Sequence, residues 1–414
     1  MSADPAEGAS GRRTLVRSGL ILALAVGAAN LLNAVFQFSL ARILDPGDYA
    51  LLAALFAVVL VGAIPPLAFQ ATTARAVASE LVRGETDAAG VILRGTLRSV
   101  LGWTAALLVL TAIAVALAAA AGLGEPLAVG AAAATIAIAL AVPVVWGGLQ
   151  GTGRFAVLSG AHLFFAATRL AAGIAIGLAG GSVAAIMLGV AGATALTVVV
   201  TALPLKSLLD SARGAPRRHL ATRPNVGAAV GLTALWALAY SDLLVARLVF
   251  SGDEAGAYAA ASVGARVLLL TPIAVTTVLF PRVATLHDPA RERRHLAAGL
   301  ATVAAVSAAL IALLWAFAEP LIELTFGDEY AAAEEWLGPL SLAMALYGLA
   351  IVYLYHFLSL GRAQIAAVLA ALLAAQVVAY ALVHGTPDDL VAVQVAFGAV
   401  TVVACEAWYL LRRP

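Results

Sequence analysis

The sequence predicts an all-α integral membrane protein of about 12 transmembrane helices, in two six-helix lobes related by a parallel pseudo-two-fold repeat. Three observations predict it: an apolar composition, twelve separate apolar runs, and basic residues confined to alternate loops. Of the 414 residues, 63% are hydrophobic and 11% are charged, whereas a soluble domain is usually about 25% charged. A membrane-spanning helix takes about 20 apolar residues, so twelve spans leave no room for a large soluble domain. The net charge of +1 argues against a nucleic-acid partner, because no basic excess is present to neutralise phosphates.

Each predicted span is an apolar run bounded by turn-forming or charged residues. The runs cover residues 18–41, 50–71, 92–119, 126–149, 155–179, 182–203, 226–250, 256–280, 296–318, 336–358, 363–383 and 390–411. The first run follows Arg12, Arg13 and Arg17, as a secretory signal would, but it is too long for one and is expected to remain as a span. The boundaries near 120–125 and 180–182 are the least distinct, because Ala-rich runs nearly merge there.

Basic residues fall in alternate loops, as expected when both termini lie in the cytoplasm. Cytoplasmic loops are enriched in Lys and Arg, and this topology places 20 of the 24 basic residues on that side. Arg42 falls at the outer end of the first span, where its side chain is expected to reach the membrane interface. Three other arginines fall within spans. We therefore expect a multi-pass protein of the plasma (inner) membrane with cytoplasmic termini.

The two halves of the chain carry similar segments about half a chain length apart. Gly47-Asp48-Tyr49 after the first span recurs as Gly252-Asp253 after the seventh, and Pro65 and Pro272 hold similar positions further on. Two halves of six spans each have the same orientation, as in parallel-repeat transporters; a chance match in Ala- and Leu-rich sequence is the alternative. The predicted organisation is a cytoplasmic tail at 1–17, an N-terminal lobe at 18–205, a basic cytoplasmic linker at 206–224, a C-terminal lobe at 225–411 and a cytoplasmic tail at 412–414.

Charged residues inside predicted spans are the first candidates for function, because a charge at bilayer depth costs about 3 kcal/mol or more. Arg169 lies mid-span in the fifth run, Arg247 near the outer end of the seventh and Arg266 mid-span in the eighth. A guanidinium binds phosphate oxygens in pairs and does not deprotonate, so these arginines are predicted to line a cavity for an anionic substrate. The alternative is a buried ion pair with Asp242. Asp242 lies on a different face of its helix from Arg247, so its expected partner is on another helix, with Arg266 as the candidate.

Other polar and aromatic residues share helix faces with one another or with these arginines. The predicted cavity set also contains Asn30, Asn33, Gln37, Trp236, Tyr240 and Tyr258. The three amides form one stripe on the first span, where they either hydrogen-bond a sugar or hold helices together. Asp242, His162 and Glu406 are the predicted sites for a coupling ion or proton.

Signatures of catalysis and metal binding are absent from the sequence. It contains neither the Gly-rich phosphate loop of ATPases nor His-Glu-x-x-His, and Cys405 is the only cysteine. We therefore predict no enzyme, no cofactor and no metal site.

Four segments have a recognisable pattern: Phe38–Tyr49 at the end of the first span, and Ser241–Leu244, Ala255–Ala260 and Leu279–Val283 in the second half. Together they resemble the polysaccharide exporter or oligosaccharide flippase family of the multidrug/oligosaccharidyl-lipid/polysaccharide exporter superfamily. The resemblance implies a V-shaped pair of six-helix lobes that flips polyprenyl-diphosphate-linked sugars. It also implies a cationic central cavity, which position assigns to the three arginines named above.

The predicted function is transport of a lipid-linked oligosaccharide, a precursor of cell-surface polysaccharide, from the inner to the outer leaflet by alternating access. The expected partners are that substrate, membrane lipid, and polysaccharide polymerase or glycosyltransferase machinery. Two alternatives remain: a small-molecule or drug-cation antiporter of the same superfamily, and a membrane scaffold that transports nothing.

Overall fold

The computed structural model describes residues 5–122, 124–211, 226–283, 289–383 and 385–411. The described residues form helices joined by short turns, and there is no strand among them. Most of the predicted linker, 212–224, and the predicted C-terminal tail lie outside the described residues. The start of that linker is helical, because α9 (Lys206–Ser211) continues the chain beyond η1 (Leu203–Leu205). The first helix, α1, begins at Pro5, inside the predicted N-terminal tail.

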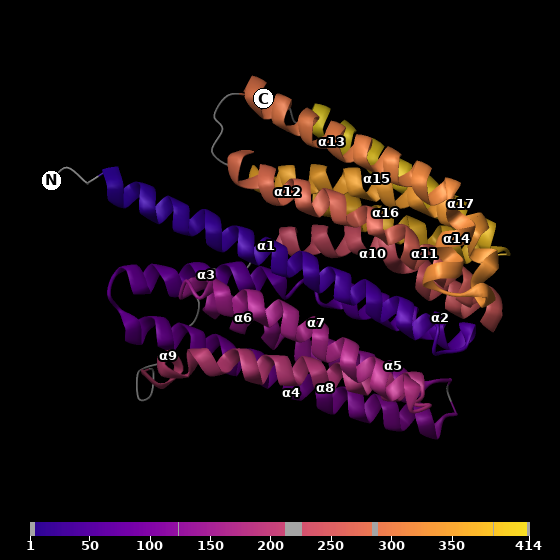
Figure 1. Ribbon diagram of the computed structural model, residues 1–414, viewed down its shortest axis with the longest axis horizontal. Helices are drawn as coiled ribbons and strands as arrows, with labels where there is room; N and C mark the ends of the chain where they lie inside the picture. Colours follow the sequence, from indigo (N-terminus) through magenta and orange to yellow (C-terminus); the bar gives the residue numbers. More distant parts are fainter. Residues whose placement is uncertain (1–4, 123, 212–225, 284–288, 384, 412–414) are drawn as a thin grey trace. The chain divides into compact units, whose positions relative to one another are not determined.

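The chain divides into two compact units, which we call unit 1 (residues 1–40 and 66–224) and unit 2 (residues 41–65 and 225–414). Unit 1 contains α1 (Pro5–Ala41) up to Leu40, α3 (Leu67–Val82), α4 (Thr86–Ala120), α5 (Pro126–Ala139), α6 (Ala141–Gly151), α7 (Phe155–Leu178), α8 (Val183–Ala202), η1 and α9. Unit 2 contains α2 (Pro46–Gly62), α10 (Val226–Val249), α11 (Gly252–Ala265), η2 (Arg266–Leu269), α12 (Leu270–Val283), α13 (Pro289–Ala316), α14 (Ala318–Thr325), η3 (Asp328–Ala333), α15 (Glu334–Ser359), α16 (Ile365–Leu382) and α17 (Pro387–Leu411). Figure 1 labels the α-helices.

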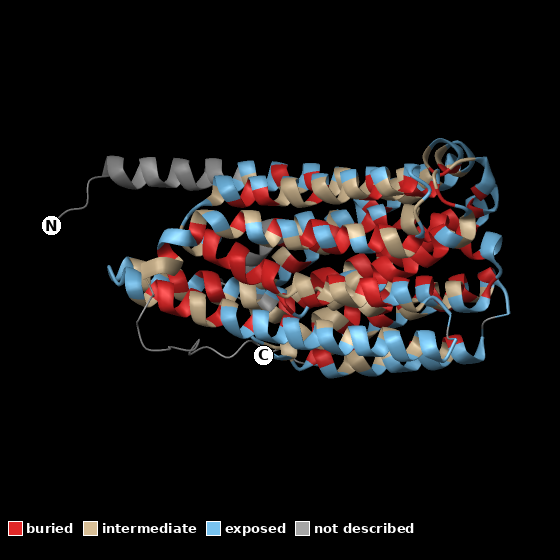
Figure 2. Ribbon diagram, turned by 90° about the horizontal axis from the view of Figure 1, so that it is seen from below, coloured by how far each residue is buried: buried red, intermediate tan, exposed pale blue. Residues whose placement is uncertain are grey.

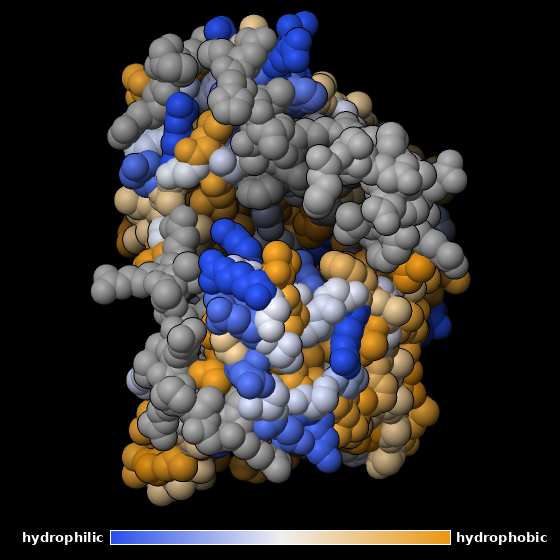
Figure 3. Space-filling model, turned by 90° about the vertical axis from the view of Figure 1, so that its left-hand side faces the viewer, coloured by the Kyte–Doolittle hydropathy of each residue, from blue (hydrophilic) through white to orange (hydrophobic). Residues whose placement is uncertain are grey.

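The helical spans agree with the predicted layout. Eleven helical stretches of the described chain are long and apolar enough to cross a membrane, and α2 is a shorter apolar helix at the place of the second predicted span. The sides of α4 expose large apolar side chains such as Trp103, Leu110 and Leu117, which are 69%, 61% and 66% exposed. Figure 3 views one end of the molecule, with hydrophilic residues gathered on that end and hydrophobic residues toward its margins. This is the distribution expected of helices whose sides face lipid.

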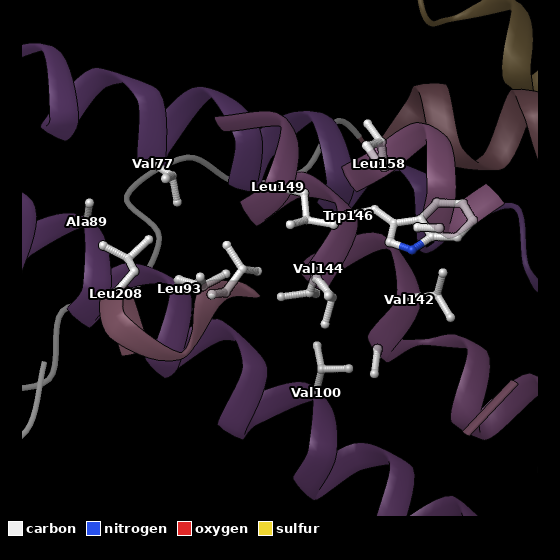
Figure 4. Packing of buried hydrophobic residues seen from close by; sticks show 14 residues of the cluster. Val77, Ala89, Leu93, Val100, Val142, Val144, Trp146, Leu149, Leu158 and Leu208 are labelled. Atoms are coloured by element: carbon white, nitrogen blue, oxygen red, sulfur yellow. The ribbon is translucent and has the colours of Figure 1, made fainter. Parts of the chain in front are cut away.

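The core of unit 1 forms where α3, α4, α6 and α7 meet. Trp146 and Leu149 of α6 pack with Leu93 of α4, Val77 of α3 and Leu158 of α7 (Figure 4). In Figure 2 many helices show a buried side and an exposed side. Burial of one helix face against neighbours is the packing expected for spans inside a bundle.

Helix α2 lies in unit 2. The sequence predicts an N-terminal lobe at 18–205, and within that range residues 41–65 pack in unit 2. The middle of α2, Tyr49–Ala57, is buried, and α2 lies against α10 and α11 (Figure 1). Small side chains allow this approach, because α11 begins with Gly252 and Gly256 in a Gly-x-x-x-Gly arrangement.

Two helices are broken at the positions that the sequence repeat relates. The segment Ala63–Pro66 separates α2 from α3, and η2 separates α11 from α12. A proline lies at or just after each break: Pro65 and Pro66 at the first, Pro272 after the second. Proline lacks a backbone N–H and so removes a helical hydrogen bond. Short, proline-interrupted helices at corresponding positions of two halves are a feature of transporter folds.

Candidate functional site

In unit 1, the side chain of Arg169 on α7 contacts residues of α1 and of its own helix. Its guanidinium donates a hydrogen bond to Oδ1 of Asn33, and its Cζ lies 5.0 Å from the ring centre of Phe36 and 5.7 Å from that of Phe165. The side chain is half-buried. An amide oxygen and two aromatic faces attract a cation without cancelling its charge. These three groups therefore orient the guanidinium.

The amides of the stripe on α1 differ in their hydrogen bonding. Asn33 binds Arg169, so this amide does hold two helices together. Asn30 and Gln37 lie on the same face, one turn to either side, and both are half-buried. The Oε1 atom of Gln37 is buried and accepts no hydrogen bond within the described part of the chain. A buried acceptor without a donor is costly, so this atom is available to a ligand.

His162 lies on the same side of α7 as Phe165 and Arg169. Its ring is 4.2 Å from that of Trp146, and the ring of Phe165 is 6.4 Å from the same indole. The predicted coupling residue His162 is therefore part of an aromatic cluster in unit 1. Its ring and that of Phe165 lie against one tryptophan of the core.

In unit 2, Asp242 and Arg266 form a buried ion pair, which is the alternative that the sequence left open beside a cavity-lining role for Arg266. The distance from Arg266 Nη2 to Asp242 Oδ1 is 2.7 Å, and the side chains are 7% and 0% exposed. Oδ2 of Asp242 accepts hydrogen bonds from Ser262 at 2.5 Å and from Tyr258 at 3.3 Å. Arg266 also donates to the carbonyl oxygen of Ala239 at 3.0 Å and to the hydroxyl of Ser262. Both charges are thus compensated inside the bundle.

The predicted aromatic residues of unit 2 surround this pair. The guanidinium of Arg266 stacks on Tyr240, with 4.3 Å from Cζ to the ring centre. Trp236 lies one turn earlier, with its ring 5.7 Å from that of Tyr240. Tyr258 is fully buried, and its hydroxyl donates a hydrogen bond to Asp242 inside the unit. Tyr240 and Trp236 are half-buried.

Arg247 and Glu406 lie apart from that pair. Arg247 is in the last turn of α10 and half-buried, and its Nε has no acceptor among the described residues. Glu406 of α17 accepts a hydrogen bond from the hydroxyl of Tyr353 on α15. The structure therefore brings Arg266, Tyr240, Tyr258 and Asp242 together, whereas Glu406 belongs to a separate contact.

Arg42 has a role that the sequence analysis missed. Its guanidinium donates to the carbonyl oxygens of Glu323 at 2.8 Å and Leu324 at 2.7 Å, and more weakly to that of Thr325 at 3.4 Å. These are the last carbonyls of α14, which have no partner within the helix and attract a cation. The expected interfacial arginine is therefore a cap for a helix 281 residues away.

Two buried polar clusters of unit 2 were also missed. Nε2 of Gln376 lies 3.1 Å from the hydroxyl of Tyr347 and 3.1 Å from Oε1 of Gln394, and both glutamines are fully buried. Nε2 of His356 is 3.2 Å from Oε1 of Glu292. Glutamine and histidine inside apolar runs were the signal available in the sequence. Among the described residues there is no group of three or more His, Cys, Asp or Glu that could hold a metal ion.

Comparison with known proteins gives a family match and a set of similar folds. A family described as "Polysaccharide biosynthesis protein" matches residues 39–335. No curated protein matches the sequence.

Three solved structures illustrate the fold similarity. An inward-facing multidrug resistance MATE family transporter of the MOP superfamily has a TM-score of 0.70 at 17% identity, over 92% of this chain and 93% of that one. The lipid II flippase MurJ, in an inward closed conformation, has a TM-score of 0.69 at 11% identity, over 95% and 88%. A MOP superfamily transporter from Pyrococcus furiosus, described by the reverse polarity of its binding pocket, has a TM-score of 0.64 at 15% identity, over 96% and 94%. The helices therefore have the MOP superfamily fold.

Proposed function

The chain belongs to the polysaccharide biosynthesis protein family, and from this premise we propose that it transports a lipid-linked oligosaccharide across a membrane. The substrate would be a sugar chain on a polyprenyl diphosphate, moved from the inner to the outer leaflet of the plasma membrane by alternating access. Both termini would then lie in the cytoplasm. The observation that carries this proposal is the cation–π and amide support of Arg169 within a span of unit 1.

Arg169 suits the diphosphate of such a substrate. An arginine at bilayer depth costs about 3 kcal/mol or more, so one that persists there is a functional candidate. Phe36, Phe165 and Asn33 leave the guanidinium charged and fix its direction. A guanidinium oriented in this way can pair with two phosphate oxygens. We therefore assign the anionic group of the substrate to Arg169.

The amide stripe suits the sugar part of the same substrate. Gln37 offers a buried acceptor oxygen, and Asn30 lies on the same face of α1. Sugar hydroxyls donate and accept hydrogen bonds, and a buried acceptor gains most when a ligand satisfies it. The polyprenyl tail would stay in the lipid, because its transfer from lipid into water is unfavourable.

The two arginines of unit 2 receive different roles in this proposal. Asp242 compensates the charge of Arg266, so we assign Arg266 and Tyr258 to the stability of unit 2. Arg247, whose Nε is buried without an acceptor in the described chain, remains a second candidate for phosphate binding, and Trp236 and Tyr240 for stacking.

The proposed driving force for this transport is the membrane potential. Moving about two negative charges outward is favoured by about 2.3 kcal/mol per charge per 100 mV of inside-negative potential. The membrane potential alone would then favour outward movement of the substrate. Coupling to an ion or proton through His162, Asp242 or Glu406 is the alternative, and delivery of substrate to a polymerase or glycosyltransferase machinery would follow on the outer side.

Binding of a polyprenyl diphosphate to the purified full chain tests the proposal. We expect R169Q to weaken binding by about 10- to 100-fold, since a charge-assisted pair contributes about 1.5–3 kcal/mol. The matched control is R98Q, because Arg98 is exposed on α4. Equal binding by R169Q and the unsubstituted protein would refute the assignment.

Tighter binding of an organic cation than of the diphosphate would favour a drug-cation antiporter, as the likeness to a multidrug resistance transporter suggests. Binding of neither ligand would favour a scaffold.

A further inference from the structure

Gly173 lies directly against the ring of Phe36 in unit 1. A Cβ atom placed on Gly173 would be 2.4 Å from Cε2 of that ring, 3.2 Å from Cδ2 and 3.3 Å from Cζ. The first distance is shorter than any carbon–carbon contact that packed side chains adopt. Phe36 is fully buried, so its ring has little space into which it can retreat. Any side chain at position 173 would therefore displace the ring.

Phe36 also forms one wall of the Arg169 site. Its ring centre is 5.0 Å from Cζ of Arg169, and Asn33, which binds the same guanidinium, lies one helical turn earlier on α1. On α7, Gly173 lies one turn after Arg169 and Phe165 one turn before it. The position of the ring, and with it the direction of the guanidinium, depends on the missing side chain at Gly173.

We propose that Gly173 is a positioning residue for anion binding: it admits the ring of Phe36 to the surface of α7 and so aims the Arg169 guanidinium at the substrate's diphosphate. This inference rests on the proposed function of Arg169. A long arginine side chain loses much freedom when it is held in one direction. Contact with an aromatic face supplies that restraint and retains the positive charge.

The test compares G173A with G160A in the purified full chain. Gly160 lies in the same helix, and a Cβ placed there would meet no heavy atom within 4 Å. The probes are geranylgeranyl diphosphate and the uncharged alcohol geranylgeraniol. We expect G173A to weaken binding of the diphosphate by about 5- to 30-fold, the range of a desolvated cation–π contact. Binding of the alcohol should change less than 2-fold, and G160A should bind both probes as the unsubstituted protein does.

The variant F36L keeps the proposal testable if G173A does not fold. Leucine lacks the ring atoms that meet position 173, and it cannot form a cation–π contact. F36L should therefore lose diphosphate affinity about as much as G173A, and F36L/G173A should lose no more than F36L alone. A purely structural glycine predicts a different result, in which F36L/G173A recovers full diphosphate binding.

The outcomes separate this inference from the proposed function. If R169Q weakens diphosphate binding but G173A and F36L do not, the positioning role is wrong and the function stands. If R169Q leaves diphosphate binding unchanged, the assignment of the diphosphate to Arg169 fails, and the positioning role of Gly173 fails with it. If the unsubstituted protein does not bind the diphosphate, the proposed function itself fails. Equal loss of alcohol and diphosphate binding in G173A would also overturn the positioning role, because displacement of the cation should affect only the charged probe.

Discussion

Gly47 and Gly252 approach each other backbone to backbone within unit 2. A Cβ placed on Gly47 would lie 3.1 Å from the Cα of Gly252, and one placed on Gly252 would lie 3.5 Å from the Cα of Gly47. These glycines are the corresponding positions of the repeat that the sequence predicts. Because neither residue has a side chain, the two backbones can come this close. The first turns of α2 and α11 are the elements that this contact joins.

The same contact predicts a large effect of substitution at Gly256. A Cβ placed there would be 2.4 Å from Cβ of Pro46 and 2.6 Å from its carbonyl oxygen. Because the backbone must move, we expect G256A to lower the free energy of unfolding by about 1–3 kcal/mol. Thermal unfolding in detergent measures this, with G192A as the control, since Gly192 has no atom within 4 Å of its placed Cβ. Equal stability of the two variants would contradict the close approach.

The Asp242–Arg266 pair predicts strong coupling between two substitutions. D242N or R266Q alone leaves one charge buried without its partner, which costs about 3–5 kcal/mol. The double variant D242N/R266Q should be more stable than the sum of the single losses implies. A double-mutant cycle by thermal unfolding measures the coupling. Additive losses would show that the two residues act independently.

Arg42 predicts local protection of α14. The R42A variant removes donors from the carbonyl oxygens of Glu323 and Leu324, so we expect amide hydrogen exchange in 318–325 to become about 10-fold faster. R83A is the control, because Arg83 is an exposed arginine that pairs with Glu80 in its own helix. Unchanged exchange in R42A would show that the arginine is dispensable for the helix end.

Gln37 predicts recognition of sugar rather than of phosphate. Q37L should weaken binding of a polyprenyl-diphosphate-linked disaccharide by about 10-fold, because one hydroxyl loses its acceptor. Binding of the polyprenyl diphosphate without sugar should be unchanged. Q364L is the matched control, since Gln364 is exposed. Equal loss for both ligands would place Gln37 in the structure of α1 instead.

The Asp242–Arg266 pair and the helical spans were within reach of sequence reasoning. The hydropathy of a residue and the cost of burying its charge do not depend on which helices it contacts. A run of apolar residues therefore identifies a span even when its packing partners are unknown. A charge inside such a run needs a partner, which made Arg266 the candidate for Asp242. The aromatic support of Arg169 was only partly predictable, because Phe165 shares its helix whereas Phe36 lies 133 positions earlier in the chain.

Arg42, α2 and Gly173 depend on which backbones approach each other. Nothing local to Arg42 identifies the carbonyl oxygens of α14 as its acceptors. The apolar run 50–71 predicts a span, but it does not identify the helices against which α2 packs. Gly173 resembles the other glycines of the apolar runs until the ring of Phe36 is placed against it.

The sequence by itself determined the number of spans and the residues that membrane burial makes costly. The tertiary structure decided which of those residues contact and compensate one another, because hydrogen bonds, cation–π contacts and steric exclusion act over a few ångströms between segments far apart in the chain.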